Sequence, residues 1–209
     1  MNSNLIRRTA LIAAAGAASL VLAACGSSNG GSAGHDGHTS TSPTASSSAA
    51  ASQGQHNAAD VAFAQGMIPH HRQAVEMADL APTRAESAEV KKLADEIKKA
   101  QDPEIKTLSG WLASWGEQVP AEGAMDHSMH GASGGMMTAE EMDKLKNSSG
   151  KAFDTAFMEM MIKHHEGAVV MAQTEKTDGA FAGAKTMADA IITSQSAEIT
   201  RMNSLLGKN

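Results

Sequence analysis

Two adjacent histidine pairs stand in matching frames of the sequence, and imidazole is a common metal ligand. Residues 67–77 read MIPHHRQAVEM and residues 161–171 read MIKHHEGAVVM, which share the skeleton Met-Ile-x-His-His-x-x-Ala-Val-x-Met. Four imidazoles on the inward flanks of helices would need polar partners, and metal ions can supply them. We therefore expect at least one histidine of each pair to bind metal. The candidate ligands are Met67, His70, His71, Met77, Met158, Met161, His164, His165 and Met171.

Methionine decides which metal these frames favour. Thioether sulfur is soft and suits Cu(I), and Ag(I) by the same logic, whereas imidazole also binds Cu(II). Zinc prefers Cys, His and carboxylate ligands. The expected cofactor is therefore copper, as Cu(I), Cu(II) or both. The structural alternative is that each methionine fills a gap in a helical core, where each histidine is satisfied by a hydrogen bond.

A third group of methionines and histidines lies between the two frames. Residues 125–137 read MDHSMHGASGGMM, a stretch too rich in glycine for a core helix. Apolar burial does not readily explain this spacing, and we interpret the stretch as an auxiliary copper-collecting loop. The alternative is a linker with an accidental bias in composition. The loop ligands would be Met125, His127, Met129, His130, Met136 and Met137.

The two frames belong to a longer duplication. Shifting the chain by 94 residues aligns both copies without a gap and carries the match into a second periodic segment. There Gln101 and Glu104 fall on Gln195 and Glu198. We expect one or both members of each set to accept the ring N–H that does not bind metal. The alternative places the glutamates in water and the glutamines over exposed patches.

The elements that must position these residues are predicted to be helices. Apolar residues recur three and four positions apart, as in residues 94–112, and no alternating pattern indicates strands. Each copy then forms an α-hairpin, with turns near residues 81–86 and 175–179. Two hairpins give an all-α, ferritin-like four-helix bundle. Pro103 is a candidate kink in the second helix.

The connection between the hairpins is expected to contain one short helix. Thr138-Ala-Glu-Glu141 resembles a capping box, which would start a helix that ends at about Asn147. Gly150 is then expected to separate this helix from the third main helix.

The beginning of the chain has the pattern of an export signal. Arg7 and Arg8 precede an uncharged apolar run that is too short to span a membrane. The run ends in LAAC at residues 22–25, which resembles a bacterial lipobox, where the signal is cut before a cysteine that is then lipidated. We expect a signal peptide at residues 1–24 and an extracytoplasmic protein anchored to the membrane through Cys25. The alternative is a stray cysteine after an ordinary secretory signal, and the export route stays open.

Composition divides the rest of the chain into a tether and a folded domain. Residues 25–57 are mostly small and polar, so they cannot bury enough surface to offset the entropy of ordering. The bundle is expected over residues 58–209. It would comprise one repeat at 58–115, the Met- and His-rich connection at 116–150 and the other repeat at 151–208.

Charge and motif content disfavour several functions. The chain has 17 basic and 23 acidic residues, a formal net charge of −6, so a basic face for nucleic acid is not indicated. Its single cysteine allows no internal disulfide. No phosphate-binding loop, dinucleotide-binding signature or nucleophile–base pair is evident, which disfavours hydrolases and dehydrogenases.

The histidine motifs, the Gln-x-x-Glu-Ile repeats and the GWLASWG end of the first repeat resemble the DUF305 family. The resemblance covers about residues 58–208. It implies a ferritin-like four-helix bundle. A cyanobacterial member of that family is a periplasmic copper-binding protein, which implies copper binding or copper resistance for this chain.

These patterns predict a protein that sequesters, buffers or transfers copper without turning over a substrate. Its expected partners are copper, the membrane and a copper-transfer protein, with a homo-oligomer left open. One rival is a ferritin-like di-iron oxidoreductase, which would need Glu-x-x-His, whereas Glu76 and Glu159 each lie five residues from a histidine. The other rival is a metal-free interaction module at the cell surface, in which the histidines are pH-sensitive packing groups.

Overall fold

The computed structural model of this chain describes residues 55–123 and 134–208. The regular secondary structure of these residues is helical, without a strand, which confirms the expected all-α fold. The helices are α1 (Ala58–Arg84), α2 (Ala88–Trp115), α3 (Ala139–Asn147), α4 (Gly150–Asp178) and α5 (Ala182–Leu205). None of the described helices is both long and apolar enough to cross a membrane. The expected signal peptide, Cys25 and nearly all of the tether lie outside the described residues.

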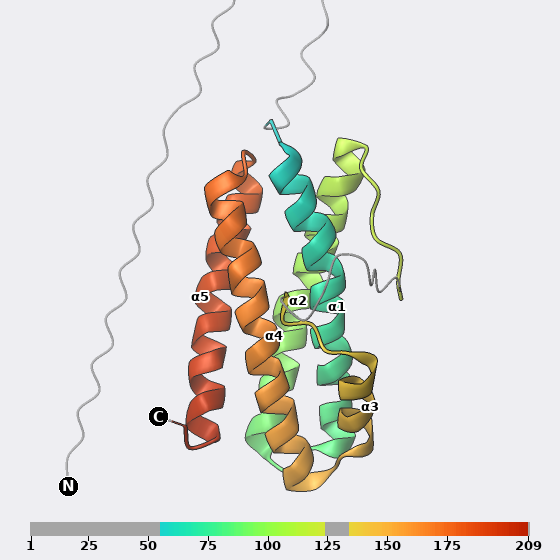
Figure 1. Ribbon diagram of the computed structural model, residues 1–209, viewed down its shortest axis with the longest axis vertical. Helices are drawn as coiled ribbons and strands as arrows, with labels where there is room; N and C mark the ends of the chain where they lie inside the picture. Colours follow the sequence, from blue (N-terminus) through green and yellow to red (C-terminus); the bar gives the residue numbers. More distant parts are fainter. Residues whose placement is uncertain (1–54, 124–133, 209) are drawn as a thin grey trace, which may run out of the picture. The chain divides into compact units, whose positions relative to one another are not determined.

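Two long helical hairpins make the bundle (Figure 1). α1 packs along α2, α4 packs along α5, and the main contact between the hairpins is that of α1 with α4. α1 and α4 run in opposite directions, and the short α3 lies beside them (Figure 1). The two copies of the repeat therefore face each other through their histidine-bearing helices.

The turns within the hairpins are shorter than the sequence indicated. α1 continues to Arg84 and α4 to Asp178, so the helices are joined by residues 85–87 and 179–181. The expected turns began several residues too early. The reason is that the last helical turns still bury side chains in the core, as Ala81 does with 0% exposure.

The short helix has the expected start but a different separation from α4. The Thr138 hydroxyl accepts the amide of Glu141, and the Glu141 carboxylate accepts the amide of Thr138, so the capping box is confirmed. Gly150 does not separate the two helices. Residues 148–149 do so, and Gly150 begins α4 in the left-handed region with φ 62°.

Proline does not end the helices in which it occurs. Pro69 and Pro82 lie inside α1, and Pro103 lies inside α2, which continues to Trp115. The kink at Pro103 stays a prediction.

The core consists of two apolar clusters on opposite sides of the histidines. One, which we call the methionine cluster, includes six buried methionines: Met77, Met137, Met142, Met158, Met161 and Met202. The other, which we call the tryptophan cluster, has Trp111 and Trp115 packed against it and only one buried methionine, Met67. Because α1 and α4 are antiparallel, each cluster contains residues from the first half of one of these helices and from the second half of the other.

Each hairpin turn is held by an aspartate from the other repeat. Asp154, near the start of α4, accepts the amides of residues 86–87 at 3.2 and 2.9 Å. Its repeat counterpart Asp60, near the start of α1, accepts the amides of residues 180–181 at 3.1 and 2.9 Å. Both carboxylates are buried, so their hydrogen bonds satisfy turn amides that would otherwise lose water without compensation. The two repeats therefore brace each other reciprocally.

We expect Asp154→Ala to lower the free energy of unfolding by about 2 kcal/mol, because two turn amides lose their charged acceptor. Urea unfolding followed by circular dichroism measures the change. Asp143→Ala, at an exposed position of α3, is the control, and Asp154→Asn should fall between the two because it keeps one acceptor oxygen. Equal unfolding midpoints for Asp154→Ala and the wild type would rule out the bracing role.

Candidate metal centre

The four predicted histidines lie together at the middle of the bundle, and none has more than 2% of its surface exposed. His70 of α1 and His164 of α4 meet across the contact between the hairpins. Their ring centroids are 3.8 Å apart and their ring planes are tilted by 40°. The centroid of His165 lies 6.3 Å from that of His164. The duplication thus brings one histidine of each pair to a shared position.

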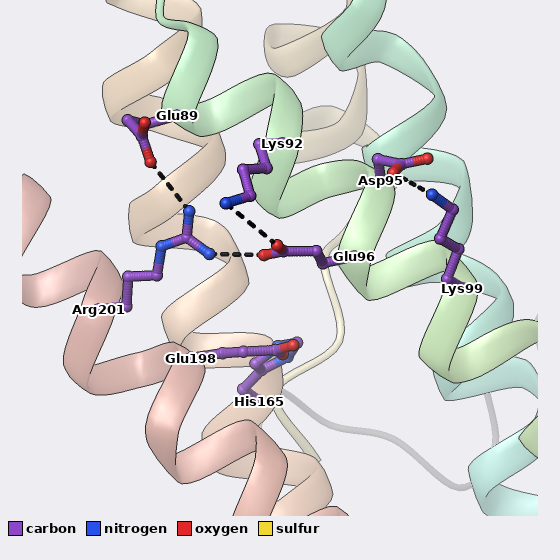
Figure 2. Close-up of polar contacts among 8 residues, drawn as sticks. All are labelled: Glu89, Lys92, Asp95, Glu96, Lys99, His165, Glu198 and Arg201. Carbon is purple, nitrogen blue, oxygen red and sulfur yellow. Dashed lines mark hydrogen bonds and ion pairs between the residues drawn. The ribbon is translucent and has the colours of Figure 1, made fainter. Parts of the chain in front are cut away.

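The other histidine of each pair is held by a glutamate from the neighbouring helix. His71 Nε2 lies 2.8 Å from Glu104 Oε2 of α2, and His165 Nε2 lies 2.6 Å from Glu198 Oε2 of α5. Figure 2 shows the second of these pairs. An ionised carboxylate can only accept, so each Nε2 carries the proton. The expected contact of a glutamate with a ring N–H is present in both repeats, and its role toward a metal stays a prediction.

The opposite ring nitrogens of these two histidines make no hydrogen bond within the described part of the chain. Nδ1 of His71 and Nδ1 of His165 are buried and have no hydrogen-bond partner among the described residues. When Nε2 alone carries the ring proton, Nδ1 offers a lone pair, and this is the form of imidazole that binds metal. Burial, followed by the proximity of the other three histidines, holds the pKa of His164 well below its usual 6.5. Burial therefore disfavours the charged form of His164.

The predicted methionines lie on both sides of the histidines. Met67 and Met171 belong to the tryptophan cluster, and Met77 and Met161 belong to the methionine cluster together with Met158. Each side thus has thioethers from both repeats. The structure groups Met77 with two methionines of the other repeat, Met158 and Met161.

The end of the long connection closes over the histidines; we call residues 134–137 the strap. Gly134 O accepts a hydrogen bond from His70 Nε2 at 3.0 Å. Gln73 holds Met137 twice, since its Nε2 donates to Met137 O at 2.9 Å and its Oε1 accepts Met137 N at 2.6 Å. Met137 is 4% exposed and belongs to the methionine cluster. Apolar burial therefore explains Met137, contrary to our expectation for the loop methionines.

Two glycines allow the strap to approach α4 closely. A Cβ on Gly167 would stand 2.1 Å from Gly134 O. A Cβ on Gly135, whose φ is 76°, would stand 2.5 Å from Lys163 O. Neither Gly167 nor Gln73 was among the predicted site residues. The two residues occupy equivalent positions of the two repeats but differ in type. This difference between the repeats could have identified them as candidates.

The remaining predicted residues have less defined places. Gln101 and Gln195 are buried, and Oε1 of each has no hydrogen-bond partner among the described residues. The glutamates alone make the expected histidine contacts there. Met136 is half-buried, and the other predicted loop ligands, Met125, His127, Met129 and His130, lie outside the described residues. Across residues 55–123 and 134–208, no group of three or more His, Cys, Asp and Glu side chains is arranged to hold a metal ion.

Asp60 and Glu175 form a buried carboxyl pair that the repeat pattern does not mark. Burial, followed by the contact with Asp60, raises the pKa of Glu175 to about 8, against the opposing charge of Lys185. Burial would raise the pKa of Asp60 too, but the amides of Asn57 and Phe181 hold it below its usual value. At pH 7 the pair therefore consists of an ionised Asp60 and a neutral Glu175.

The sequence and the fold of this chain are similar to those of known proteins. The family described as a domain of unknown function, DUF305, matches residues 60–206. No curated protein matches the sequence. A DUF305 protein of Streptomyces coelicolor, described as a secreted protein, is 33% identical in sequence. The match covers 72% of this chain and 93% of that protein, with a TM-score of 0.65.

CopM is a second similar structure and has been solved with metals bound. Its Cu(II)-bound form is 39% identical, covering 70% of this chain and 94% of CopM with a TM-score of 0.61. Its Cu(I)-bound form is 36% identical over the same shares, with a TM-score of 0.59. CopM has also been solved in an Ag-bound form.

Proposed function

We propose, because this chain belongs to the DUF305 family, that its bundle binds copper at the four buried histidines. One observation carries the proposal. His70 and His164 meet across the hairpins, and beside them the Glu104-held His71 and the Glu198-held His165 each have an unpartnered Nδ1. Buried nitrogen acceptors without donors cost stability, and a bound cation would offset that cost.

The donor set fits copper. Imidazole nitrogen binds both oxidation states, and the surrounding thioethers favour Cu(I) and Ag(I). Glutamates that accept the Nε2–H fix each ring and increase the donor strength of Nδ1. The copper- and silver-bound forms of CopM, a relative with the same fold, support this assignment.

The role that we propose is binding rather than turnover. The protein would sequester, buffer or transfer copper outside the cytoplasm, held to the membrane through lipid on Cys25. A protein that accepts the copper would be its partner. The loop ligands Met125, His127, Met129 and His130 would collect copper for the bundle. The secreted description of the Streptomyces coelicolor relative supports the extracytoplasmic location.

The test is a titration of the full chain with Cu(I), without oxygen, and separately with Cu(II), each in competition with a chelator of known affinity. Replacing His70, His71, His164 and His165 together by Ala is expected to weaken the tightest site about 100-fold or more, because its nitrogen donors are gone. The Met/His loop is unchanged in this variant and should keep its own weaker uptake.

A second variant with four Gln substitutions keeps polar bulk in the core, and thermal unfolding checks that both variants are folded. Equal copper affinity in wild type and variants would leave the loop as the copper site and refute the proposal. Tight, stoichiometric iron uptake with oxygen consumption would favour the di-iron alternative. No metal uptake at all would favour the metal-free module.

A further inference from the structure

A set of ion pairs joins α2 to α5, the outer helices of the two hairpins. Among the described helices, α2 packs along α1 and α5 packs along α4, but α2 and α5 do not pack along each other. Arg201 of α5 spans the distance, because it donates to Glu96 at 2.6 Å and to Glu89 at 3.1 Å, both on α2 (Figure 2). We call these three residues the inter-hairpin bridge. It connects two helices that have little packing of their own.

The inter-hairpin bridge lies next to the glutamate that holds His165. Arg201 follows Glu198 by three residues on α5, so the two side chains lie on one face of the helix, about one turn apart. The Glu198 carboxylate lies 2.6 Å from His165 Nε2, and the glutamate side chain is 20% exposed whereas that of the histidine is 0% exposed. Figure 2 shows this pair beside the bridge. Glu198 therefore separates His165 from water on the face that the bridge crosses.

The first repeat has no equivalent of the inter-hairpin bridge. The residue that corresponds to the arginine is Thr107, which is uncharged. The residues that correspond to the two glutamates are Gly183 and Ala190, which are uncharged as well. The Glu104 side chain that holds His71 is also 20% exposed, but it has no such ion pairs beside it. The duplication thus provides His71 as an internal reference for His165.

The inter-hairpin bridge can open without unfolding the core. Its side chains are 32% to 59% exposed, and exposed ion pairs stabilise weakly and are screened by salt. Lys92 Nζ lies 3.8 Å from the second carboxylate oxygen of Glu96, so Glu96 keeps a cationic partner when Arg201 leaves. Local openings that break few buried contacts require much less free energy than global unfolding. The bridge is therefore a reversible closure.

We propose that the inter-hairpin bridge is a salt-sensitive closure over His165, and that ions and small solutes reach the buried histidines from this face when it opens. The part of this inference that concerns metal ions rests on the proposed function, to which it adds an entry route. Arg201 binds no metal in this scheme. It controls the rates of entry and exit and leaves the equilibrium affinity unchanged.

The test measures how fast diethyl pyrocarbonate modifies each histidine of the metal-free full chain, with mass spectrometry to assign the modified residue. Arg201→Gln is expected to speed the modification of His165 about fivefold, because two ion pairs no longer oppose opening, and to leave the rate at His71 unchanged. Raising NaCl from about 0.05 M to about 0.5 M should speed the reaction at His165 in the wild type but not in this variant. Lys99→Gln is the matched control, since it removes an ion pair to Asp95 within α2 and should change neither rate (Figure 2).

The kinetics of Cu(II) binding give a second readout. Association and dissociation should both become faster by the same factor in Arg201→Gln, so that the equilibrium affinity equals that of the wild type. Glu96→Gln leaves the arginine paired with Glu89 and should give a smaller effect of the same kind. Thermal unfolding checks that each variant is folded.

Two results would overturn this inference alone. One is equal modification of His165 in wild type and Arg201→Gln. The other is a rise at His71 as large as that at His165, which would mean that the substitution loosens the whole bundle. A four-histidine variant that binds copper as the wild type does would instead refute the proposed function, and the rates in the metal-free chain would still decide whether the bridge closes over His165.

Discussion

Gly167→Ala is expected to lower the free energy of unfolding by about 3 kcal/mol, although alanine is the better helix former. The new Cβ would stand 2.1 Å from Gly134 O and 2.6 Å from Gly134 C. Both atoms belong to backbone, which cannot rotate away as a side chain can. Urea unfolding of the two proteins measures the loss. The strap should also detach, so limited proteolysis near Gly134 is expected to become faster.

Two other helical glycines separate this clash from helix propensity. Gly110 of α2 has open space where its Cβ would stand, so Gly110→Ala should stabilise the protein by about 1 kcal/mol. At Gly66 the nearest atom would be Met171 Cε at 2.9 Å, the end of a flexible side chain, so Gly66→Ala should be nearly neutral. A Gly167→Ala protein as stable as Gly110→Ala would show that the strap does not press on α4.

Glu175→Gln is expected to remove the fall in stability that the Glu175 carboxyl causes between pH 4.5 and about 8. In the wild type the folded carboxyl titrates near 8 and the unfolded carboxyl near its ordinary 4.5. The folded state therefore keeps its proton over a range in which the unfolded state releases it. The contribution of this carboxyl to stability therefore falls as pH rises through the window, by roughly 5 kcal/mol.

Glutamine is neutral and can donate its amide N–H to the ionised Asp60, so the variant should be more stable than wild type above pH 8 and similar below pH 4.5. Urea unfolding across this range measures both curves. Glu159→Gln, at an exposed position of α4, is the control and should keep the wild-type slope. Parallel curves for Glu175→Gln and wild type would mean that Glu175 is ionised in the fold.

The sequence was sufficient for the helical hairpins and for the glutamate contacts. A repeat with helical spacing determines which residues share a face, and this indicated that Gln101, Glu104 or both would meet the histidine pair. The structure shows that the contacts are His71 with Glu104 and His165 with Glu198. The meeting of His70 with His164 depends on how the hairpins pack, and spacing within one helix carries no such information. The duplication indicates two equivalent halves, but it does not indicate which of their histidines meet.

The strap could not be predicted for a related reason. Its position depends on Gln73 and Gly167, which are equivalent positions at which the repeats differ. A search for residues that the two repeats share does not identify such positions. The burial of Met137 was not predicted, because local glycine content gives no information about the side chain of Gln73, 64 residues earlier, that holds its backbone. The Glu175 carboxyl has alanine as its repeat counterpart, Ala81, and gave no signal.

The reciprocal aspartates also set the order in which the protein can mature on the ribosome. Ser87 lies in the turn of the first hairpin, and the carboxylate that holds its amide, on Asp154, is 67 residues further along the chain. A nascent first repeat therefore emerges with its turn amides open to water. The first turn can therefore be completed only after Asp154, near the start of the second repeat, has left the ribosome.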